Sequence, residues 1–448
     1  MGRGACECLA DRLYYTPVEI RDPIHGPIEV SPQEKAVIAH PLVQRLRRVR
    51  QLGFAEEVFP GATHTRFLHS IGTMHLAGLA FDAVVRDLTF TSAKERERVR
   101  ATLRLAALLH DLGHAPVSHG GHLLLPSARA MGISSDDRPV THEEMTRALL
   151  LESDLATTIE LEFAGLGVRP EHVACILAGR PDGDDPFLSG AASLLPLLRQ
   201  LIAGELDCDR MDYLLRDSYF TGVTYGRFDK DWLLSHMGAC TVLGQVSQAI
   251  DSTAVHAFED FLLSRYHMFL MVYSHQKTLI YHRMLARFLA SDDARGIRCP
   301  ADGDAFARCD DEWLISALRA SSNRWASRIV NHNPLRLVAE AWDDEANELD
   351  QCRPDMDRLL SGDREWVDTA VEFSSLRSDS LNSRPDLATL YVRVKHPGSR
   401  RPVLPVQDYS DLFSRHARPK RVLRLYCDES EAEEARALLV RLAGLGVT

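Results

Sequence analysis

A chain of 448 residues with 45% hydrophobic and 26% charged residues has the composition of a folded globular protein with a sizeable core. No apolar run is long enough to cross a membrane and the start lacks a signal-peptide core, so we expect a cytoplasmic protein. The net charge of −11 argues against a protein that coats nucleic acid, although a local arginine cluster or a metal ion can still bind an anionic substrate. The nine cysteines, including the close pair Cys6 and Cys8, follow no disulfide or zinc spacing and are expected to be free thiols.

The first predicted element is a hairpin over residues 16–31, where apolar and polar residues alternate around Gly26-Pro27. Helices and loops then alternate by hydrophobic spacing and capping signals. The sequence predicts a helix from Pro41, a loop over 60–67, helices over 69–86 and 94–114 (the latter stopping near Gly113 and Pro116), a loop over 126–140, and a helix from His142 capped by Thr141.

The second half of the chain begins as helix and ends as a mixture of strand and helix. The elements predicted there are one long helix over 196–220, one or two buried helices over 254–290, polar irregular stretches over 291–312 and 345–365, strands over 388–394 and 421–427, and an amphipathic helix over 429–445. We therefore predict a mainly helical body followed by a small α/β unit.

The string HDLGH places His110 and Asp111 at the expected end of a helix, where Gly113 permits an irregular turn that points both side chains toward one position. An imidazole nitrogen beside a carboxylate oxygen suits Fe, Mn, Zn or Mg. A lone buried His–Asp pair is more often structural. Two further residues favour a metal site, because His69 opens another helix after a basic loop and Asp209 lies in an acidic segment.

The acidic segment places Asp209, Tyr213 and Asp217 four residues apart, so that they share one face of a helix. Three acidic residues between positions 205 and 209 would be costly to bury without cations. We therefore expect a metal ion beside Asp209 and an arginine or ammonium group near Asp217.

The order H…HD…D resembles the HD-domain phosphohydrolase superfamily and, more narrowly, the deoxynucleoside triphosphate triphosphohydrolases. The latter include an animal enzyme that also has a sterile-alpha-motif domain. We do not expect that domain here, because few residues precede the hairpin. The resemblance rests on RDPIHG (21–26), QRLRRVRQLG (44–53), VFPGATHTRFLHSIG (58–72), HDLGHAPVSHG (110–120), THEE (141–144) and DRMDYLLRDSYFTG (209–222).

The resemblance spans roughly residues 17–445 and implies a mainly α fold, with an HD-domain helical core and a small C-terminal α/β subdomain. The expected parts are an N-terminal tail (1–16), the HD core (17–290), a helical or irregular extension (291–387) and the α/β subdomain (388–448). The implied reaction is metal-dependent hydrolysis of a deoxynucleoside triphosphate to a deoxynucleoside and inorganic triphosphate. The family also forms homo-oligomers, so a dimer or tetramer is expected.

The resemblance assigns a function to each matching residue. It implies that one divalent metal ion (Mn, Fe, Mg or Zn) is held by His69, His110, Asp111 and Asp209. The histidines matching those that serve the attacked phosphate and its leaving group are His114 and His142, with His119 lining the same site. The implied substrate-binding residues are Gln51, Leu52, Arg66, Arg210, Tyr213, Asp217, Arg265 and Tyr273.

The sequence departs from the family in its regulatory positions and beside the phosphates. Gln44 and Arg47 match residues that read an activating guanine between subunits, but Ala39 and Val18 replace an acid and a lysine of that allosteric site. The segment 268–272 is apolar where basic residues are expected. Two alternatives therefore stay open: an HD phosphohydrolase acting on another nucleotide (a monophosphate, a signalling nucleotide or a nucleic-acid end), or a nucleotide-binding sensor. Nucleic-acid binding is left open but is not expected.

Several charged residues have simpler interpretations. We expect His25 to be a hairpin histidine bonded to backbone, while His64 is a weaker candidate for the cleft. The arginines between 45 and 50 are expected partly on a solvated helix face, and the same environment is expected for Glu205 and Asp212.

Overall fold

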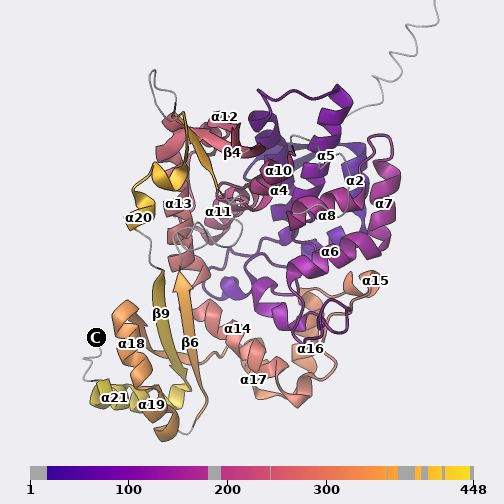
Figure 1. Ribbon diagram of the computed structural model, residues 1–448. Helices are drawn as coiled ribbons and strands as arrows, with labels where there is room; N and C mark the ends of the chain where they lie inside the picture. The colour runs from indigo at the N-terminus through magenta and orange to yellow at the C-terminus, as the bar shows by residue number, and fades with distance from the viewer. Residues whose placement is uncertain are drawn as a thin grey trace, which may run out of the picture.

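The computed structural model describes residues 18–179, 193–242, 244–360, 362–371, 389–394, 402–415 and 419–443. The predicted N-terminal tail, with Cys6 and Cys8, lies outside the described residues. Helices dominate the described part, which confirms the mainly α prediction (Figure 1). None of the described helices combines the length and the apolar character needed to cross a bilayer.

The N-terminal half consists of one hairpin and a set of packed helices. The hairpin pairs β1 (Val18–Asp22) with β2 (Gly26–Val30) in antiparallel register, as predicted, and its turn lies just before Gly26 rather than at Gly26-Pro27. The helices that follow are α2 (Pro32–Ala39), α3 (Pro41–Arg45), α4 (Arg66–Val84), α5 (Ala93–Leu109), α6 (His142–Glu152), α7 (Asp154–Glu162) and α8 (Pro170–Ala178).

Two of these helix ends bear on the site. Thr141 caps α6 in a capping box with Glu144, as the sequence predicted. Helix α5 ends at Leu109, earlier than the predicted end near Gly113, so His110 is its C-cap and Asp111 lies in the turn beyond it. The chain therefore leaves the helix at the start of HDLGH, before it reaches Gly113.

The predicted long helix over 196–220 is wrong, because the structure contains α10 (Leu195–Ala203) and α11 (Cys208–Thr221). Gly204 leaves the helical conformation, and a Cβ there would lie 2.4 Å from the carbonyl oxygen of Gln200. Asp207 then starts the second helix by accepting a hydrogen bond of 2.7 Å from the backbone N–H of Arg210. The break places Asp209 in the first turn of α11 rather than in mid-helix.

The predicted one or two helices over 254–290 are two. They are α13 (Val255–Met268) and α14 (Gln276–Leu289), joined by a π-helical turn at Phe269–Tyr273. Such turns are rare and often occur at functional sites. Between them and α11 lie α12 (Lys230–His236) and the strands β3 (Met237–Val242) and β4 (Gln245–Asp251).

The stretches 291–312 and 345–365 were predicted to be irregular, but the structure contains helices in both. The first stretch contains α15 (Gly303–Phe306) and the start of α16 (Asp311–Ala320), and the second contains most of α18 (Asp343–Gln351) and all of α19 (Arg353–Leu359). Helix α17 (Arg324–Val330) lies between the two stretches. Buried Ala346, Leu349 and Met356 give α18 and α19 an apolar face that packs in a small core with β9, which explains why polar residues elsewhere in the stretch do not prevent a helix.

The two predicted C-terminal strands are present but belong to different sheets. One sheet has the order β3-β4-β7-β8, with β7 (Tyr391–Arg393) parallel to β4 and β8 (Val403–Pro405) at its edge. The other has β9 (Lys420–Cys427) between β5 (Arg336–Trp342) and β6 (Arg364–Val371), both antiparallel to it. The closing helix α21 (Ala432–Ala443) matches the prediction. The domain boundaries stay a prediction.

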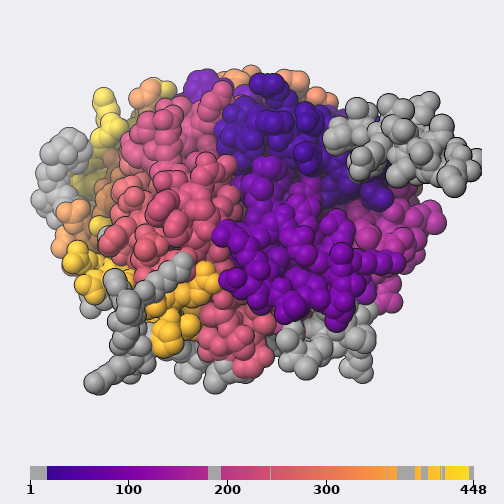
Figure 2. Space-filling model, turned by 90° about the horizontal axis from the view of Figure 1, so that it is seen from above, coloured from indigo at the N-terminus to yellow at the C-terminus, as the bar shows by residue number. Residues whose placement is uncertain are grey.

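Two hydrophobic cores underlie this arrangement. The larger one runs through the helices of the N-terminal two thirds, and the smaller one joins β5 and β9 to α18, α19 and α21. Figure 1 shows this second unit below and to one side of α4, α10 and α11. Figure 2 shows the N-terminal and central parts side by side on one face of the molecule. The predicted metal ligands lie among the helices of the larger core.

Candidate metal and phosphate site

Three helices meet at the predicted metal ligands. Helix α4 packs against both α5 and α11, and it carries the fully buried His69 one turn from its start. His110 and Asp111 follow the last turn of α5, and Asp209 lies in the first turn of α11. Three of the four side chains thus lie at helix ends. The break between α10 and α11 brings Asp209 close to the other three.

The ligand atoms converge on one point. His69 Nε2 lies 3.0 Å from Asp209 Oδ1 and 3.3 Å from His110 Nε2, and His110 Nε2 lies 3.5 Å from the same Asp209 oxygen. The Asp111 carboxylate lies 3.6 Å from His69 Nε2 and 3.4 Å from His110 Nε2, and it also forms an ion pair with Arg66. His69, His110 and Asp209 form a group that could hold a metal ion, and Asp111 forms a second such group with His114 and His142.

The second nitrogen of each ligand histidine is already in use. His69 Nδ1 lies 2.8 Å from a carboxylate oxygen of Asp212, and His110 Nδ1 lies 2.8 Å from the carbonyl oxygen of Ala107. Both Nδ1 atoms therefore donate, so in the neutral form of the two rings the Nε2 lone pairs face each other at 3.3 Å. A cation between them removes that repulsion, so the donor set fits a divalent metal ion.

The electrostatics of the site also favour a cation. Burial lowers the pKa of His69, but hydrogen bonds with Asp209 and Asp212 outweigh it and raise that pKa to about 10. Burial raises the pKa of Asp209, yet His110 and His69 hold it below its ordinary value. A positive charge at this point is thus stabilised, and a metal ion supplies it without a proton.

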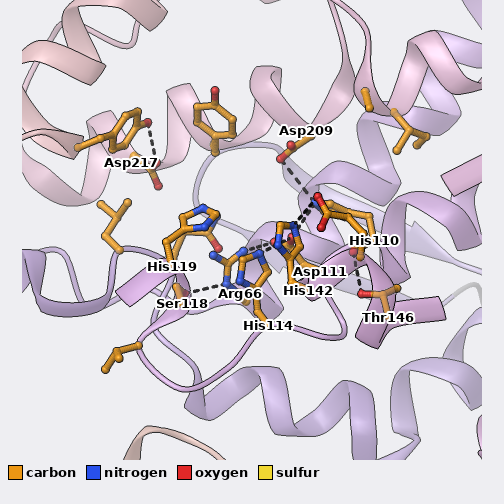
Figure 3. Close-up of a pocket in the computed structure, with 18 of the residues that line it drawn as sticks. Arg66, His110, Asp111, His114, Ser118, His119, His142, Thr146, Asp209 and Asp217 are labelled. Carbon is orange, nitrogen blue, oxygen red and sulfur yellow. Dashed lines mark hydrogen bonds and ion pairs between the residues drawn. The ribbon is translucent and has the colours of Figure 1, made fainter. Parts of the chain in front are cut away.

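Three further histidines line the space beside these ligands. The rings of His114 and His142 stack with centroids 4.0 Å apart, and His119 meets His114 edge-on at 5.0 Å. Burial, followed by the nearby Arg66 guanidinium, holds the pKa of His114 well below its ordinary value, and burial also lowers the pKa of His142. Figure 3 shows His114 and His142 beside Arg66 and Asp111 in the cavity. The lowered pKa values favour the neutral form of both imidazoles.

The loop after HDLGH is strained in order to reach the cavity. Val117 and Ser118 have φ values of 52° and 56°, which are unfavourable for a β-branched residue in particular. Asp311 holds the loop by accepting a 2.7 Å hydrogen bond from the Val117 N–H. Ser118 in turn accepts a 2.8 Å hydrogen bond from Nε of Arg66, so this loop orients the guanidinium at the cavity wall.

The cavity has a volume of about 580 Å³, which suits a nucleotide-sized ligand. On its far side Tyr273 donates a 2.8 Å hydrogen bond to Asp217, whose other oxygen lies 2.7 Å from His64 Nε2. The Tyr213 and Tyr273 rings meet edge to face at 5.9 Å. The structure thus places His64 and Tyr273 beside Asp217, where an arginine or ammonium group was expected.

Most of the predicted site residues share this one cavity. Those that line it are Gln51, Leu52, Arg66, His110, Asp111, His114, His119, His142, Asp209, Tyr213, Asp217 and Tyr273. His69 lies directly behind the wall. Arg210 points away and donates to the Gly204 carbonyl at 2.6 Å, and the Arg265 guanidinium lies 5.2 Å from the centre of the Phe269 ring. The individual assignments stay predictions.

The predicted allosteric pair lies outside the cavity lining. Gln44 donates a 2.7 Å hydrogen bond to the carbonyl of Ile38, and Arg47 donates one of 2.8 Å to the Gln44 side chain. Their neighbour Arg45 is wholly buried rather than on a solvated face, and it donates to the backbone carbonyls of His114 and Cys309. Arg45 therefore supports the turn that carries the catalytic candidates.

The sequence interpretation missed the residues behind the metal ligands. Asp212 and Glu205 were expected on a solvated face, but their exposed fractions are 0% and 1%. His25 was expected to bond backbone, but its Nε2 lies 2.7 Å from a carboxylate oxygen of Asp212. One local signal was available, since Arg216 follows Asp212 at the i,i+4 spacing of a helical ion pair.

Comparisons with known proteins find two family models that each match part of this chain. A family model of the HD domain matches residues 66–215, and a model of the HD associated region matches residues 233–338. A crystal structure of a hypothetical protein from Aquifex aeolicus superposes with a TM-score of 0.73 at 28% identity, covering 95% of this chain and 100% of that chain.

Two curated relatives set the scale of the sequence similarity. An uncharacterized protein of Methanocaldococcus jannaschii is 31% identical over 314 residues, which are 70% of this chain and 58% of that protein. The human deoxynucleoside triphosphate triphosphohydrolase SAMHD1 is 28% identical over 286 residues, which are 61% of this chain and 44% of that enzyme. The chain thus spans roughly half the length of the curated relatives it matches. The chain contains an HD domain followed by an HD associated region, and it is a distant homologue of SAMHD1.

Proposed function

We propose that this protein hydrolyses deoxynucleoside triphosphates to a deoxynucleoside and inorganic triphosphate. The observation that supports it is the shared cavity, in which a cation site, a cluster of neutral histidines and a tyrosine–aspartate pair face one nucleotide-sized space. The homologous human enzyme carries this activity in its name. A homo-oligomeric state and a cytoplasmic location belong to the same proposal.

The proposed metal ligands are His69, His110, Asp111 and Asp209. A divalent ion held there would supply Lewis-acid polarisation of the α-phosphate and would favour the ionised form of the attacking water. The protein's own part is to keep both histidine Nε2 atoms unprotonated and aimed at the ion, through the hydrogen bonds on their Nδ1 atoms. The Arg66 guanidinium, fixed by Ser118, offsets phosphate charge at the same wall.

Proton transfer is assigned to His114 and His142. Attack by water forms a new O–P bond at the α-phosphorus and breaks the bond to the 5′-oxygen, which needs a proton to leave. The net change moves one proton from water to that oxygen, so a histidine that starts neutral also ends neutral. The lowered pKa values of both residues fit this cycle, and His114 Nε2 lies 3.3 Å from the carboxylate of the proposed metal ligand Asp111.

Preference for deoxyribose is assigned to Tyr213 and Asp217, which share a face of α11. In this proposal the Tyr213 ring packs under the sugar and excludes a 2′-hydroxyl, and Asp217, held by His64 and Tyr273, accepts a hydrogen bond from the 3′-hydroxyl.

One feature of the cavity supports a different nucleotide as an alternative substrate. Phe269 and Val272, from the π-helical turn, give that wall an apolar character, and Leu279 extends it. An HD phosphohydrolase acting on a different nucleotide would use the same metal and histidines with another group against this wall.

Product analysis tests the proposal. Purified protein is incubated with Mn²⁺ or Mg²⁺ and each dNTP or NTP, alone and in mixtures, and phosphate products are separated by ion exchange. The expected products are inorganic triphosphate and deoxynucleoside from at least one dNTP. Release of only monophosphate or diphosphate would reject the triphosphohydrolase reaction, and activity only in mixtures would reveal a nucleotide activator.

A further inference from the structure

The fully buried ion pair behind His69 is not used by the proposed reaction. Asp212 and Arg216 are both 0% exposed, and they stand one helical turn apart on α11. Burying a carboxylate and a guanidinium is costly, and such pairs are a poor source of stability on their own. Their position therefore needs another explanation.

The Asp212 carboxylate accepts hydrogen bonds on all sides. One oxygen accepts from His69 Nδ1 and from Arg216 Nε, each at 2.8 Å. The other accepts from His25 Nε2 at 2.7 Å and from Arg216 Nη2 at 2.8 Å. Four hydrogen bonds fill the capacity of a carboxylate, so Asp212 has a single orientation and imposes it on the His69 ring.

The network continues into the N-terminal hairpin. Arg216 Nη1 donates a 2.8 Å hydrogen bond to Asp22, whose second oxygen accepts from the backbone N–H groups of Ile24 and His25 at 2.9 Å each. The turn of the hairpin is thereby locked in the form that presents the His25 ring to Asp212. The aspartate and the histidine of RDPIHG therefore bind the buried ion pair as well as shaping the hairpin turn.

The helix that carries His69 is shaped to admit this network. A Cβ at Gly72, one turn after His69 on α4, would lie 1.9 Å from Asp212 Oδ1 and 2.3 Å from Arg216 Nη2. Glycine is therefore required for the ion pair to approach α4 closely. Two carboxylates and one guanidinium also leave one negative charge behind His69, and this charge favours a cation on the other side of the ring.

We propose that Asp212, braced by Arg216, His25 and Asp22, is the positioning residue for the metal ligand His69, so that the N-terminal hairpin is a structural part of the metal site. Asp212 keeps the proton of His69 on Nδ1 and directs Nε2 to the ion. The proposal rests on the proposed metal site but not on the identity of the substrate.

The experiment compares metal binding in Asp212→Asn and in a matched control, Glu34→Gln. Glu34 and Arg104 form another buried carboxylate–arginine pair, with Nε to Oε1 at 2.5 Å, that does not touch the proposed metal ligands. Mn²⁺ affinity is measured by calorimetry on metal-stripped full-length protein, and Co²⁺ absorption reports the ligand geometry. We expect Asp212→Asn to bind Mn²⁺ about 10- to 100-fold more weakly, with an altered Co²⁺ spectrum, while Glu34→Gln keeps wild-type binding.

Three results would overturn the proposal or its premise. Wild-type Mn²⁺ affinity in Asp212→Asn overturns it, as does an equal loss in Glu34→Gln, because that would be a general effect of stability. If the wild-type protein binds no metal at all, the proposed metal site itself fails.

A second variant covers the case in which Asp212→Asn does not fold. Asp22→Asn weakens the hold on Arg216 without touching His69, and we expect a several-fold loss of Mn²⁺ affinity in a folded protein. Unchanged affinity and an unchanged Co²⁺ spectrum in this variant would overturn the role of the hairpin.

Discussion

The two sides of the cavity are built on different principles. On the metal side, His69, His110 and Asp209 have their polar atoms within 3.0–3.5 Å of one another, and the His69 and His110 rings are each fixed by a further hydrogen bond on Nδ1. On the opposite side, Phe269 and Val272 project from a π-helical turn into a mostly apolar wall. Chemistry restricts which residues can serve the first side, whereas the second needs only a shape. Similarity to relatives is therefore a better guide to the chemistry of the metal side than to the substrate that the apolar wall accepts.

The largest effect is expected from removing a metal ligand. Asp209→Ala or His110→Ala should lower kcat on the order of 10³-fold or more, because the cation that stabilises the phosphate charge is lost. Turnover with Mn²⁺ and the amount of bound metal are measured together, with circular dichroism as the control for folding. Activity within tenfold of wild type would show that the reaction does not use this site.

A loss of about 10²- to 10⁴-fold in kcat is expected for His114→Ala, since general acid–base catalysis contributes on that scale. The matched control is His122→Ala, an exposed histidine on the same loop that does not line the cavity. Metal content should stay at the wild-type level in both variants. Unchanged turnover in His114→Ala would remove its assignment to proton transfer and favour a nucleotide-binding sensor.

A smaller change is expected on the other side of the cavity. Tyr213→Ala should reduce the ratio of kcat/KM for a dNTP to that for the matching NTP by about 10- to 100-fold, because space opens for a 2′-hydroxyl. The chemical step should remain close to wild type, since Tyr213 is not a metal ligand. An unchanged ratio would mean that another part of the wall selects the sugar.

The smallest effect concerns folding stability below neutral pH. Burial lowers the pKa of His75 and of His282 to about 4, so between pH 6.5 and 4 the unfolded chain binds protons that the folded chain does not. The free energy of unfolding should therefore decrease as the pH falls through this window. Urea denaturation from pH 7 to 4.5 measures it, and His282→Gln should make the decrease shallower. A pH slope equal to wild type in that variant would contradict the assignment.

Local patterns in the sequence were enough to predict several elements of the site. The four-residue spacing of Asp209, Tyr213 and Asp217 matches one face of α11, and the capping box of Thr141 marks the start of α6. Strand β9 and helix α21 also follow from their hydrophobic spacing. These features depend on neighbours within a few positions, which a linear sequence records directly.

The tertiary structure alone decided how the site is held. His25 meets Asp212 across 187 positions of the chain, and Asp311 holds Val117 across 194. No periodicity records such contacts, so Asp212 looked like one more acid on a solvated face. The break at Gly204 was hidden for a similar reason, because the apolar residues on both sides of it fit a single helix. The sequence by itself determined the mainly α class and the chemistry of the candidate ligands, because both depend on residue type and short spacing. The orientation of those ligands depends on which distant residues become buried beside them, and only the folded chain decides that.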